Sequence, residues 1–233
     1  MLSDVHGNAV ALAAVLAELG AVDLVVFGGD LTWGPLPQET LELVDGIQSP
    51  TMFVRGNADR ALAEAPTTPR GRWMHDVHTD DQRAFLSGLP ETVGVNVEGL
   101  GPVRVCHGSP RSDEELITFA TPEARMRALM ENVDERILVS AHTHLQFDRQ
   151  VGGIRSINAG SVGMPYVDGP ATAHWALLGP DVELWRTEYD LDETARRYRA
   201  TDDPLAEEMV ELLFAPPAPA KIVEHAESVE FSG

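Results

Sequence analysis

The sequence predicts an α/β fold, a four-layer α/β/β/α sandwich in which two mixed sheets pack face to face between outer helices. Two features of the 233 residues lead to this prediction. Apolar runs and amphipathic stretches alternate over the first 60 residues, a spacing typical of parallel strands joined by crossover helices. Beyond residue 90, short apolar runs follow one another, some across glycine turns, which indicates hairpins in a second sheet.

The first elements follow from the placing of apolar residues and glycines. Residues 8–19 carry apolar side chains at a helical period and end at Gly20, so we expect a helix there. The continuous apolar run 24–27 predicts a buried strand. Residues 38–44 have helical character, and 51–54 form the next short apolar run. The order strand, helix, strand predicts parallel pairing of the two runs.

Most of the remaining elements are predicted to be strands. Gly152-Gly153 and Gly179-Pro180 are typical hairpin turns between apolar runs. Two stretches, 114–119 and 123–132, have helical character and interrupt the strands. The expected strands are residues 93–97, 103–106, 137–140, 146–151, 154–157, 173–178 and 182–187.

The two ends of the chain differ from its middle. Residues 191–214 are amphipathic with a helical period, and a Pro/Ala linker follows at 215–220. We therefore divide the chain into a main domain, 1–190, and a C-terminal helical extension and tail, 191–233. At the other end, the first strand would be only three residues long, against about five for an ordinary strand. We expect the true start to lie upstream of Met1.

Composition excludes several classes of function. With 17 basic and 37 acidic residues the chain carries a net charge of -20, which disfavours binding to long nucleic acids. Hydrophobic residues make up 43%, enough for a folded core. The single cysteine, Cys106, cannot form an intrachain disulfide, and no apolar run approaches the ~20 residues of a membrane span. We expect a cytoplasmic protein that does not bind membranes.

Side chains that can hold a metal occur at the start of the chain and directly after four later apolar runs. Because the carboxyl ends of parallel strands meet at one edge of a sheet, we expect these side chains to converge. Each residue alone has an ordinary structural explanation, such as a turn, but their shared placement favours a metal site. The candidates are Asp4, His6, Asp30, Asn57, His107, His142 and His144.

The chemistry of these seven candidates constrains the ion. Carboxylate, imidazole and amide ligands without a thiolate suit manganese, zinc, iron or nickel. Seven ligands exceed the needs of one ion with open positions, so two ions sharing a bridging carboxylate fit better. Two-metal sites hold their ions about 3.5–4 Å apart.

The motifs resemble those of the calcineurin-like metallophosphoesterase superfamily, whose blocks are D-x-H, G-D, G-N-H-[DE], a lone His followed by Gly, and G-H-x-H. In this sequence the corresponding blocks occur in the same order over roughly residues 1–165, as Asp4-Val5-His6, Gly29-Asp30, Gly56-Asn57, His107-Gly108 and Ala141-His142-Thr143-His144. Three further stretches resemble the small bacterial and archaeal phosphodiesterase-like branch, at 34–37, 107–111 and 158–163.

The resemblance implies two divalent ions, with manganese expected and iron, zinc or nickel as alternatives, in a metallophosphoesterase domain at 1–190. It assigns to the first ion Asp4, His6, Asp30 and His144. It assigns to the second ion, with Asp30 bridging, Asp30, Asn57, His107 and His142. It also implies that a metal-bridging hydroxide attacks phosphorus at a catalytic centre formed around Asp30, Asn57 and His107.

The sequence departs from the family pattern in two places. Ala58 stands where the fuller motif has a histidine that serves as general acid for the leaving group. Loss of a positioned acid typically costs about 10²–10⁴-fold when the leaving group needs a proton. Ala58 therefore favours substrates with good leaving groups, or a donor from elsewhere, such as His75 or His78. The second departure, Ala141 in place of glycine, is one that a turn can absorb.

Two residues are predicted to contact substrate. Asn8 could touch phosphate or support its turn, and Arg111 could clamp phosphate through two hydrogen bonds or remain in solvent. A serine-hydrolase site is disfavoured because no G-x-S-x-G motif is present.

The predicted function is hydrolysis of small phosphodiester or phosphomonoester substrates at a dinuclear metal centre. The alternatives are a protein Ser/Thr phosphatase, a dinucleoside polyphosphatase, or, from another class, a metal-binding regulatory module with little turnover. Two divalent ions bring four positive charges against the carboxylates of Asp4 and Asp30. The net charge of -20 therefore excludes a nucleic-acid track but not a small phosphate ester. The sequence does not indicate an oligomeric state.

Overall fold

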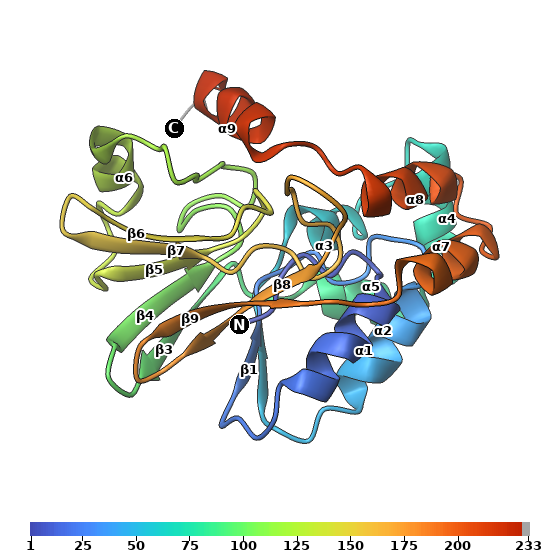
Figure 1. Ribbon diagram of the computed structural model, residues 1–233, viewed down its shortest axis with the longest axis horizontal. Helices are drawn as coiled ribbons and strands as arrows, with labels where there is room; N and C mark the ends of the chain where they lie inside the picture. Colours follow the sequence, from blue (N-terminus) through green and yellow to red (C-terminus); the bar gives the residue numbers. More distant parts are fainter. Residues whose placement is uncertain (230–233) are drawn as a thin grey trace.

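Two β-layers form the centre of the computed structural model, which describes residues 1–229 (Figure 1). The first layer is a five-stranded mixed sheet in the order β3-β4-β5-β7-β6. The middle strands β4, β5 and β7 are parallel, while β3 and β6 pair antiparallel at the two edges. Its strands are β3 (Thr92–Val97), β4 (Gly101–Cys106), β5 (Ile137–Ser140), β6 (Phe147–Val151) and β7 (Ile154–Asn158).

The second layer joins two short pairs of strands through the first residues of the chain. The parallel pair is β1 (Val25–Phe27) with β2 (Thr51–Phe53), and the antiparallel pair is β8 (Ala173–Leu178) with β9 (Val182–Thr187). Leu2 lies between them: its backbone bonds to β1 on one side, and the neighbouring Met1 exchanges two hydrogen bonds with Ala176 of β8. The second layer is therefore mixed as well.

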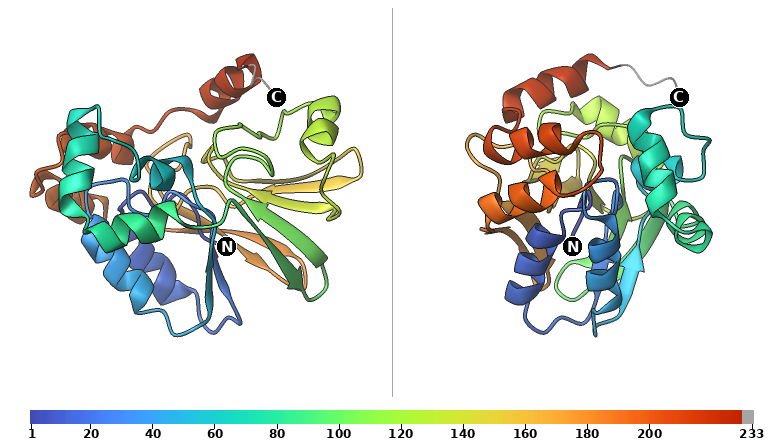
Figure 2. Two further views of the ribbon diagram at one scale, coloured as in Figure 1. Left: turned by 180° about the vertical axis from the view of Figure 1, so that it is seen from behind. Right: turned by 90° about the vertical axis from the view of Figure 1, so that its right-hand side faces the viewer.

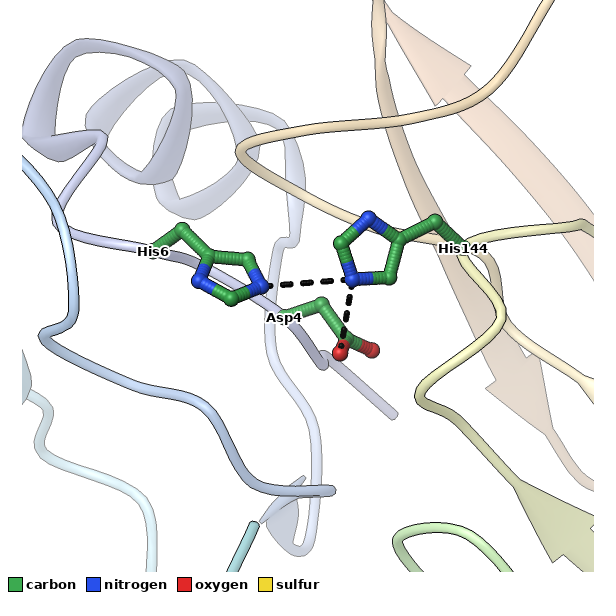
Figure 3. A group of neighbouring side chains, drawn as sticks. All are labelled: Asp4, His6 and His144. Carbon is green, nitrogen blue, oxygen red and sulfur yellow. Dashed lines mark hydrogen bonds and ion pairs between the residues drawn. The ribbon is translucent and has the colours of Figure 1, made fainter. Parts of the chain in front are cut away.

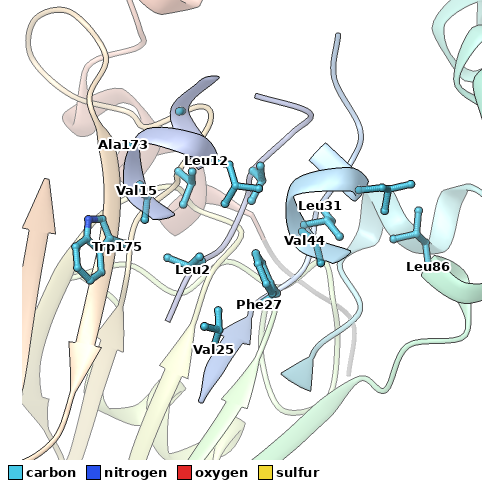
Figure 4. Packing of buried hydrophobic residues seen from close by; sticks show 14 of the residues in the cluster. Leu2, Leu12, Val15, Val25, Phe27, Leu31, Val44, Leu86, Ala173 and Trp175 are labelled. Atoms are coloured by element: carbon cyan, nitrogen blue, oxygen red, sulfur yellow. The ribbon is translucent and has the colours of Figure 1, made fainter. Parts of the chain in front are cut away.

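Three hydrophobic clusters separate the four layers and confirm the predicted sandwich. Alternate residues of the strands face the space between the sheets, where Val26, Val105, Val139 and Ile157 share one cluster. A second cluster packs α1 (Ala9–Glu18) and α2 (Pro37–Asp45) on the outer face of the second layer (Figure 4). A third packs α6 (Glu123–Leu129) on the outer face of the five-stranded sheet. Figure 2 shows these helices on opposite sides of the strands.

One predicted helix is wrong. Residues 114–119 form a loop instead, because its side chains have partners that a helix would not allow. Glu115 is buried against Arg111 and Ser109, and Ile117 is completely buried in the core of the α6 side. Thr118 donates two hydrogen bonds, from its backbone N–H to Thr121 Oγ1 and from its own Oγ1 to Glu227. The following helix α6 is also shorter than the predicted 123–132.

Four helices were not predicted. They are α3 (Asn57–Ala61), α4 (Pro69–Val77), α5 (Asp80–Ser87) and α9 (Pro219–Ser228). Two of them begin at caps that the sequence carries: Thr68 caps α4, and Thr79 with Gln82 forms a capping box on α5. These polar helices have narrow apolar faces, which hides their period.

The predicted helical stretch 191–214 is two helices. They are α7 (Leu191–Arg199) and α8 (Ala206–Phe214), which are separated by a turn that contains Pro204. Residues 230–233 of the predicted tail lie outside the described part of the chain. Among residues 1–229, no helix has the length and apolar character needed to cross a bilayer.

Candidate metal centre

All seven predicted ligands lie together at the carboxyl ends of the strands. They form two adjacent groups, and within each group the candidate ligand atoms lie within 4.8 Å of one another. The first group is Asp4, His6 and His144, and the second is Asp30, His107 and His142. Asn57, at the start of α3, joins the second group through its Oδ1 atom, 3.0 Å from His107 Nε2.

The first group brings together the start of the chain and the loop that follows β5 (Figure 3). His144 Nε2 lies 3.1 Å from Asp4 Oδ1 and 3.2 Å from His6 Nε2. The Asp4 side chain is completely buried, and its Oδ1 atom makes no regular hydrogen bond. A buried carboxylate oxygen in that condition is an unsatisfied acceptor, which a cation would complete.

Asp30 connects the two groups. Its Oδ2 atom lies 3.6 Å from His6 Nε2 in the first group and 3.5 Å from His107 Nε2 in the second. Its other oxygen, Oδ1, accepts a hydrogen bond from the backbone N–H of Ala58. One carboxylate oxygen thus faces both groups, as a bridging ligand would have to.

Backbone carbonyls determine which nitrogen each histidine presents. The Nδ1 atoms of His6, His107 and His144 lie 2.6–3.2 Å from the carbonyls of Trp33, Gly28 and Met164. Because a carbonyl can only accept, each of these nitrogens carries a proton. In the neutral rings the Nε2 atoms are then lone-pair donors that face into the centre.

The facing nitrogens provide a test of whether the site suits a metal. His6 Nε2 and His144 Nε2 are 3.2 Å apart, and so are His107 Nε2 and His142 Nδ1. Two lone pairs at this distance repel each other unless a cation or an added proton lies between them. Together with two buried carboxylates, this donor set fits divalent metal ions with nitrogen and oxygen ligands.

The backbone at the ligands adopts an uncommon conformation. Within residues 1–229, every non-glycine residue with positive φ is a candidate ligand, with φ between 47° and 64°. Such left-handed conformations cost roughly 1–3 kcal/mol each, and they cluster at functional sites. The five residues are Asp4, His6, Asp30, His142 and His144.

Asp59 ties the two central loops of the site together. Its buried carboxylate accepts hydrogen bonds from the backbone N–H groups of Asp30, Leu31 and Gly56, at 2.8–3.1 Å. This arrangement joins the loop that carries Asp30 to the loop that carries Asn57. Asp59 thus supports the centre without being a candidate ligand.

Burial and charge together set the protonation of the centre. Burial alone would raise the pKa of Asp30, but His107 and His6 beside it hold that pKa well below its usual range. Burial opposes charge on His107, yet the nearby Asp30 carboxylate raises the pKa of His107 to about 10. Burial lowers the pKa values of His6 and His142 to about 4. Asp30 is therefore ionised and ready to hold a cation, which would displace the proton from His107 Nε2.

The two residues predicted to contact substrate are both bonded to other groups of the protein. Asn8 is completely buried: its amide donates to Gly163 O and contacts Tyr189 Oη, and its Oδ1 caps α1. Arg111 pairs with Glu115, at 2.6–3.0 Å. In this structure Asn8 supports its turn, and Arg111 would have to leave Glu115 to reach a phosphate.

Two further residues with reactive side chains are either held by other contacts or unreactive. His78 is buried, with one ring nitrogen beside Met74 O and the other beside Thr32 Oγ1, so it is not placed to serve as a proton donor to substrate. Cys106 is completely buried, and burial raises the pKa of its thiol, which makes it a poor nucleophile. These contacts leave the two ligand groups as the centre of the chemistry.

Comparison with known proteins agrees with this geometry. Residues 1–178 match the model of the calcineurin-like phosphoesterase superfamily domain. The chain is 30% identical over 195 residues to phosphodiesterase YfcE of Escherichia coli K12, a match that covers 77% of this chain and 86% of the relative.

Two solved structures share the fold over nearly the whole chain. A metallophosphoesterase from Sphaerobacter thermophilus superposes with a TM-score of 0.74 at 27% identity, covering 91% of this chain and 96% of the other. Hypothetical protein PH1004 from Pyrococcus horikoshii OT3 superposes with a TM-score of 0.75 at 22% identity, covering 93% and 97%, which supports the fold alone. The chain therefore belongs to the calcineurin-like phosphoesterase superfamily and is a metal-dependent phosphoesterase.

Proposed function

We propose that this chain hydrolyses small phosphodiesters at a two-metal centre formed by the seven converging side chains. The observation that carries the proposal is the position of Asp30, whose Oδ2 atom faces a nitrogen ligand of each group. The first site would comprise Asp4, His6, Asp30 and His144. The second would comprise Asp30, Asn57, His107 and His142.

The protein residues have distinct tasks in this proposal. When bound, two divalent ions supply an activated water and neutralise charge on the phosphoryl group. Asp30 would be shared by the two sites and so fix their separation. The hydrogen bonds to backbone carbonyls keep the Nε2 atoms of His6, His107 and His144 facing the centre. Four positive charges from the ions exceed the two negative charges of Asp4 and Asp30. The centre would thus attract a phosphate ester despite the acidic surface.

Ala58 favours phosphodiesters with good leaving groups. It is buried beside Asp30, with a methyl group in place of the imidazole that the fuller motif carries. No proton donor stands at this position, and His78 is engaged elsewhere. Activity toward diesters agrees with the name of the Escherichia coli relative, a phosphodiesterase. We propose manganese as the ion, with iron, zinc and nickel as alternatives.

The proposal is tested by counting metals and measuring turnover on matched substrates. Metal-free protein is reconstituted with Mn²⁺ and assayed on an aryl phosphodiester, the matching aryl phosphomonoester, a dinucleoside polyphosphate and a phosphopeptide. We expect two Mn²⁺ per chain and the highest kcat/KM on the diester. Two bound ions with no turnover would favour a metal-binding regulatory module. Fewer than one ion per chain would contradict the site itself.

A substitution tests the role of Ala58 separately. Ala58→His restores the residue of the fuller motif and should raise kcat on the monoester relative to the diester, because a proton donor would again face the leaving group. Asp30→Asn serves as the control for metal-dependent turnover. An Ala58→His protein that binds two ions without any gain on the monoester would contradict the argument from the missing acid.

A further inference from the structure

The segment 164–166 holds His144 from two sides. The carbonyl of Met164 accepts a hydrogen bond from His144 Nδ1 at 2.6 Å. The ring of Tyr166 stacks on the imidazole of His144, with centroids 4.9 Å apart and an interplanar angle of 20°. The position of His144 therefore depends on how residues 164–166 are anchored.

The helices α7 and α8 support the Met164 side. Met164 packs against a cluster that includes Tyr198 of α7 and Met209, Val210 and Leu213 of α8. The backbone is tied as well, because Ala171 N–H donates to Leu213 O at 2.8 Å. These helices lie beyond residue 178, where the match to the family domain ends.

The helix α9 supports the Tyr166 side. Ile222 and Val223 of α9 pack against the same cluster as Tyr166, a cluster that contains the completely buried Ile117. Glu227 of α9 also accepts hydrogen bonds from Thr118 Oγ1 and Thr121 Oγ1, at 2.8 and 3.0 Å. In Figures 1 and 2, α9 lies at the end of the molecule where the strand-end loops gather.

A second path leads from α9 to the histidine pair. Glu227 holds the loop that contains Ile117, and Ile117 O accepts a hydrogen bond from Thr143 Oγ1 at 3.2 Å. Thr143 stands between His142 and His144 in the chain. Both ligands have positive φ, so their backbone needs external support to stay in place.

We propose that the C-terminal extension is a positioning element for the metal centre, with α8 and α9 fixing two sides of the His144 ring, its Nδ1 edge through Met164 and its face through Tyr166. This inference rests on the proposed role of His144 as a metal ligand. The extension is then part of the working site, although it supplies no ligand. Loosening either helix should weaken the first metal site more than it weakens the second.

The test uses the full chain and measures Mn²⁺ binding by calorimetry, independently of turnover. Ala226 of α9 is completely buried, so Ala226→Gln should undock the helix. His225→Gln is the matched control, because it places the same side chain at the neighbouring exposed position. A His142→Ala background removes a second-site ligand and isolates the first site. Thermal unfolding verifies that each variant is folded, and Glu227→Gln provides a milder change.

We expect Ala226→Gln to weaken Mn²⁺ binding at the first site about 10-fold, the lower end of the range for outer-shell changes, and His225→Gln to leave it unchanged. Tyr166→Ala should weaken it similarly, while Tyr166→Phe keeps the stack and the affinity. Adding Ala226→Gln to Tyr166→Ala should cost less than the further factor of about 10 expected of independent changes, because part of the effect of α9 passes through the Tyr166 stack.

Four results separate the possible outcomes. Wild-type affinity in folded Ala226→Gln and Glu227→Gln proteins would overturn the inference, and so would full additivity with Tyr166→Ala. Two tightly bound ions without hydrolysis in the wild-type protein would contradict the proposed function but not this inference. A wild-type chain that binds no Mn²⁺ would overturn both.

Discussion

At the scale of single residues, the metal centre depends on close contacts that leave no room for larger side chains. The candidate ligands approach one another at the ends of strands, and glycines allow neighbouring loops to touch them. Gly56 shows this most clearly, because a Cβ atom there would lie 2.1 Å from Asp30 Oδ1. The identity of the motif residues was predictable from the sequence. The left-handed φ of Asp30 was not, because it results from tertiary contacts with Asp59 and Gly56.

Gly56→Ala should therefore disable the centre without unfolding the protein. The added methyl group must displace the Asp30 carboxylate, and a misplacement of about 1 Å in a catalytic site can cost about 100-fold in rate. We expect a fall of that size in kcat/KM together with weaker Mn²⁺ binding. Gly46→Ala is the control, since its nearest contact would be 3.4 Å. Equal activity of the two variants would argue against the strict geometry proposed for Asp30.

His174 should make the stability of the protein depend on pH. Burial, together with the positive charge of Arg186, lowers its pKa from 6.5 to about 4. Because the unfolded chain binds the proton more readily, this contribution to stability is complete above about pH 6.5 and is lost as the pH falls toward 4. Between pH 8 and pH 5 it amounts to about 2 kcal/mol.

The measurement compares urea unfolding of wild-type and His174→Gln proteins at several pH values. The wild-type protein should lose more free energy of unfolding than the variant as the pH falls from 7 to 5. Since both proteins keep the same metal ligands, titration of the centre cancels in the comparison. Parallel pH profiles for the two proteins would show that His174 is not held neutral by burial.

At the scale of elements, most strands were predictable and several helices were not. The runs 103–106 and 137–140 are mostly apolar, and both form inner strands of the five-stranded sheet. Residues 114–119 have a helical pattern, but they form a loop. Glu115 and Thr118 in this loop bind partners outside the segment, Arg111 and Glu227. Local patterns therefore located the elements that the core requires. They did not locate elements that depend on partners distant in the sequence.

A buried ion pair joins α4 to the turn before α8. Arg70 Nη2 lies 2.7 Å from Asp203 Oδ2, and these side chains are only 10% and 0% exposed. Removing one partner leaves the other charge buried, so Asp203→Asn should lower the free energy of unfolding by about 3 kcal/mol. Arg70→Met in the same protein should recover most of that loss, since no buried charge would remain.

Chemical denaturation of the single and double variants checks this prediction. The exposed pair of Arg199 and Glu207, 2.9 Å apart, provides the control. Glu207→Gln should change the free energy of unfolding far less than Asp203→Asn does, because exposed ion pairs contribute little. If the double variant were no more stable than Asp203→Asn, the loss would come from packing or hydrogen bonding rather than from an unpaired charge.

At the scale of the whole molecule, the acidic surface and the metal centre act in opposite directions on an anionic substrate. The net charge of -20 repels anions at long range. The two proposed ions attract them at short range, within a centre that contains only two carboxylates as ligands. The convergence of the candidate ligands could be predicted from the sequence, but the contacts that connect the C-terminal helices to His144 are visible only in the folded chain.

This balance predicts how salt should affect substrates of different length. A small diester carries about one charge and enters the centre at close range, so its kcat/KM should change little between low and moderate ionic strength. An oligonucleotide extends many phosphates over the acidic surface, where salt screens the repulsion because the Debye length is about 10 Å at 0.1 M. Its kcat/KM should be lower and should rise several-fold with salt.

Steady-state kinetics on an aryl diester and on an oligonucleotide, at constant Mn²⁺, measure how kcat/KM of each substrate depends on ionic strength. If oligonucleotide cleavage were faster and fell with salt, the surface would have to contain a positive track, and the proposed preference for small substrates would be wrong.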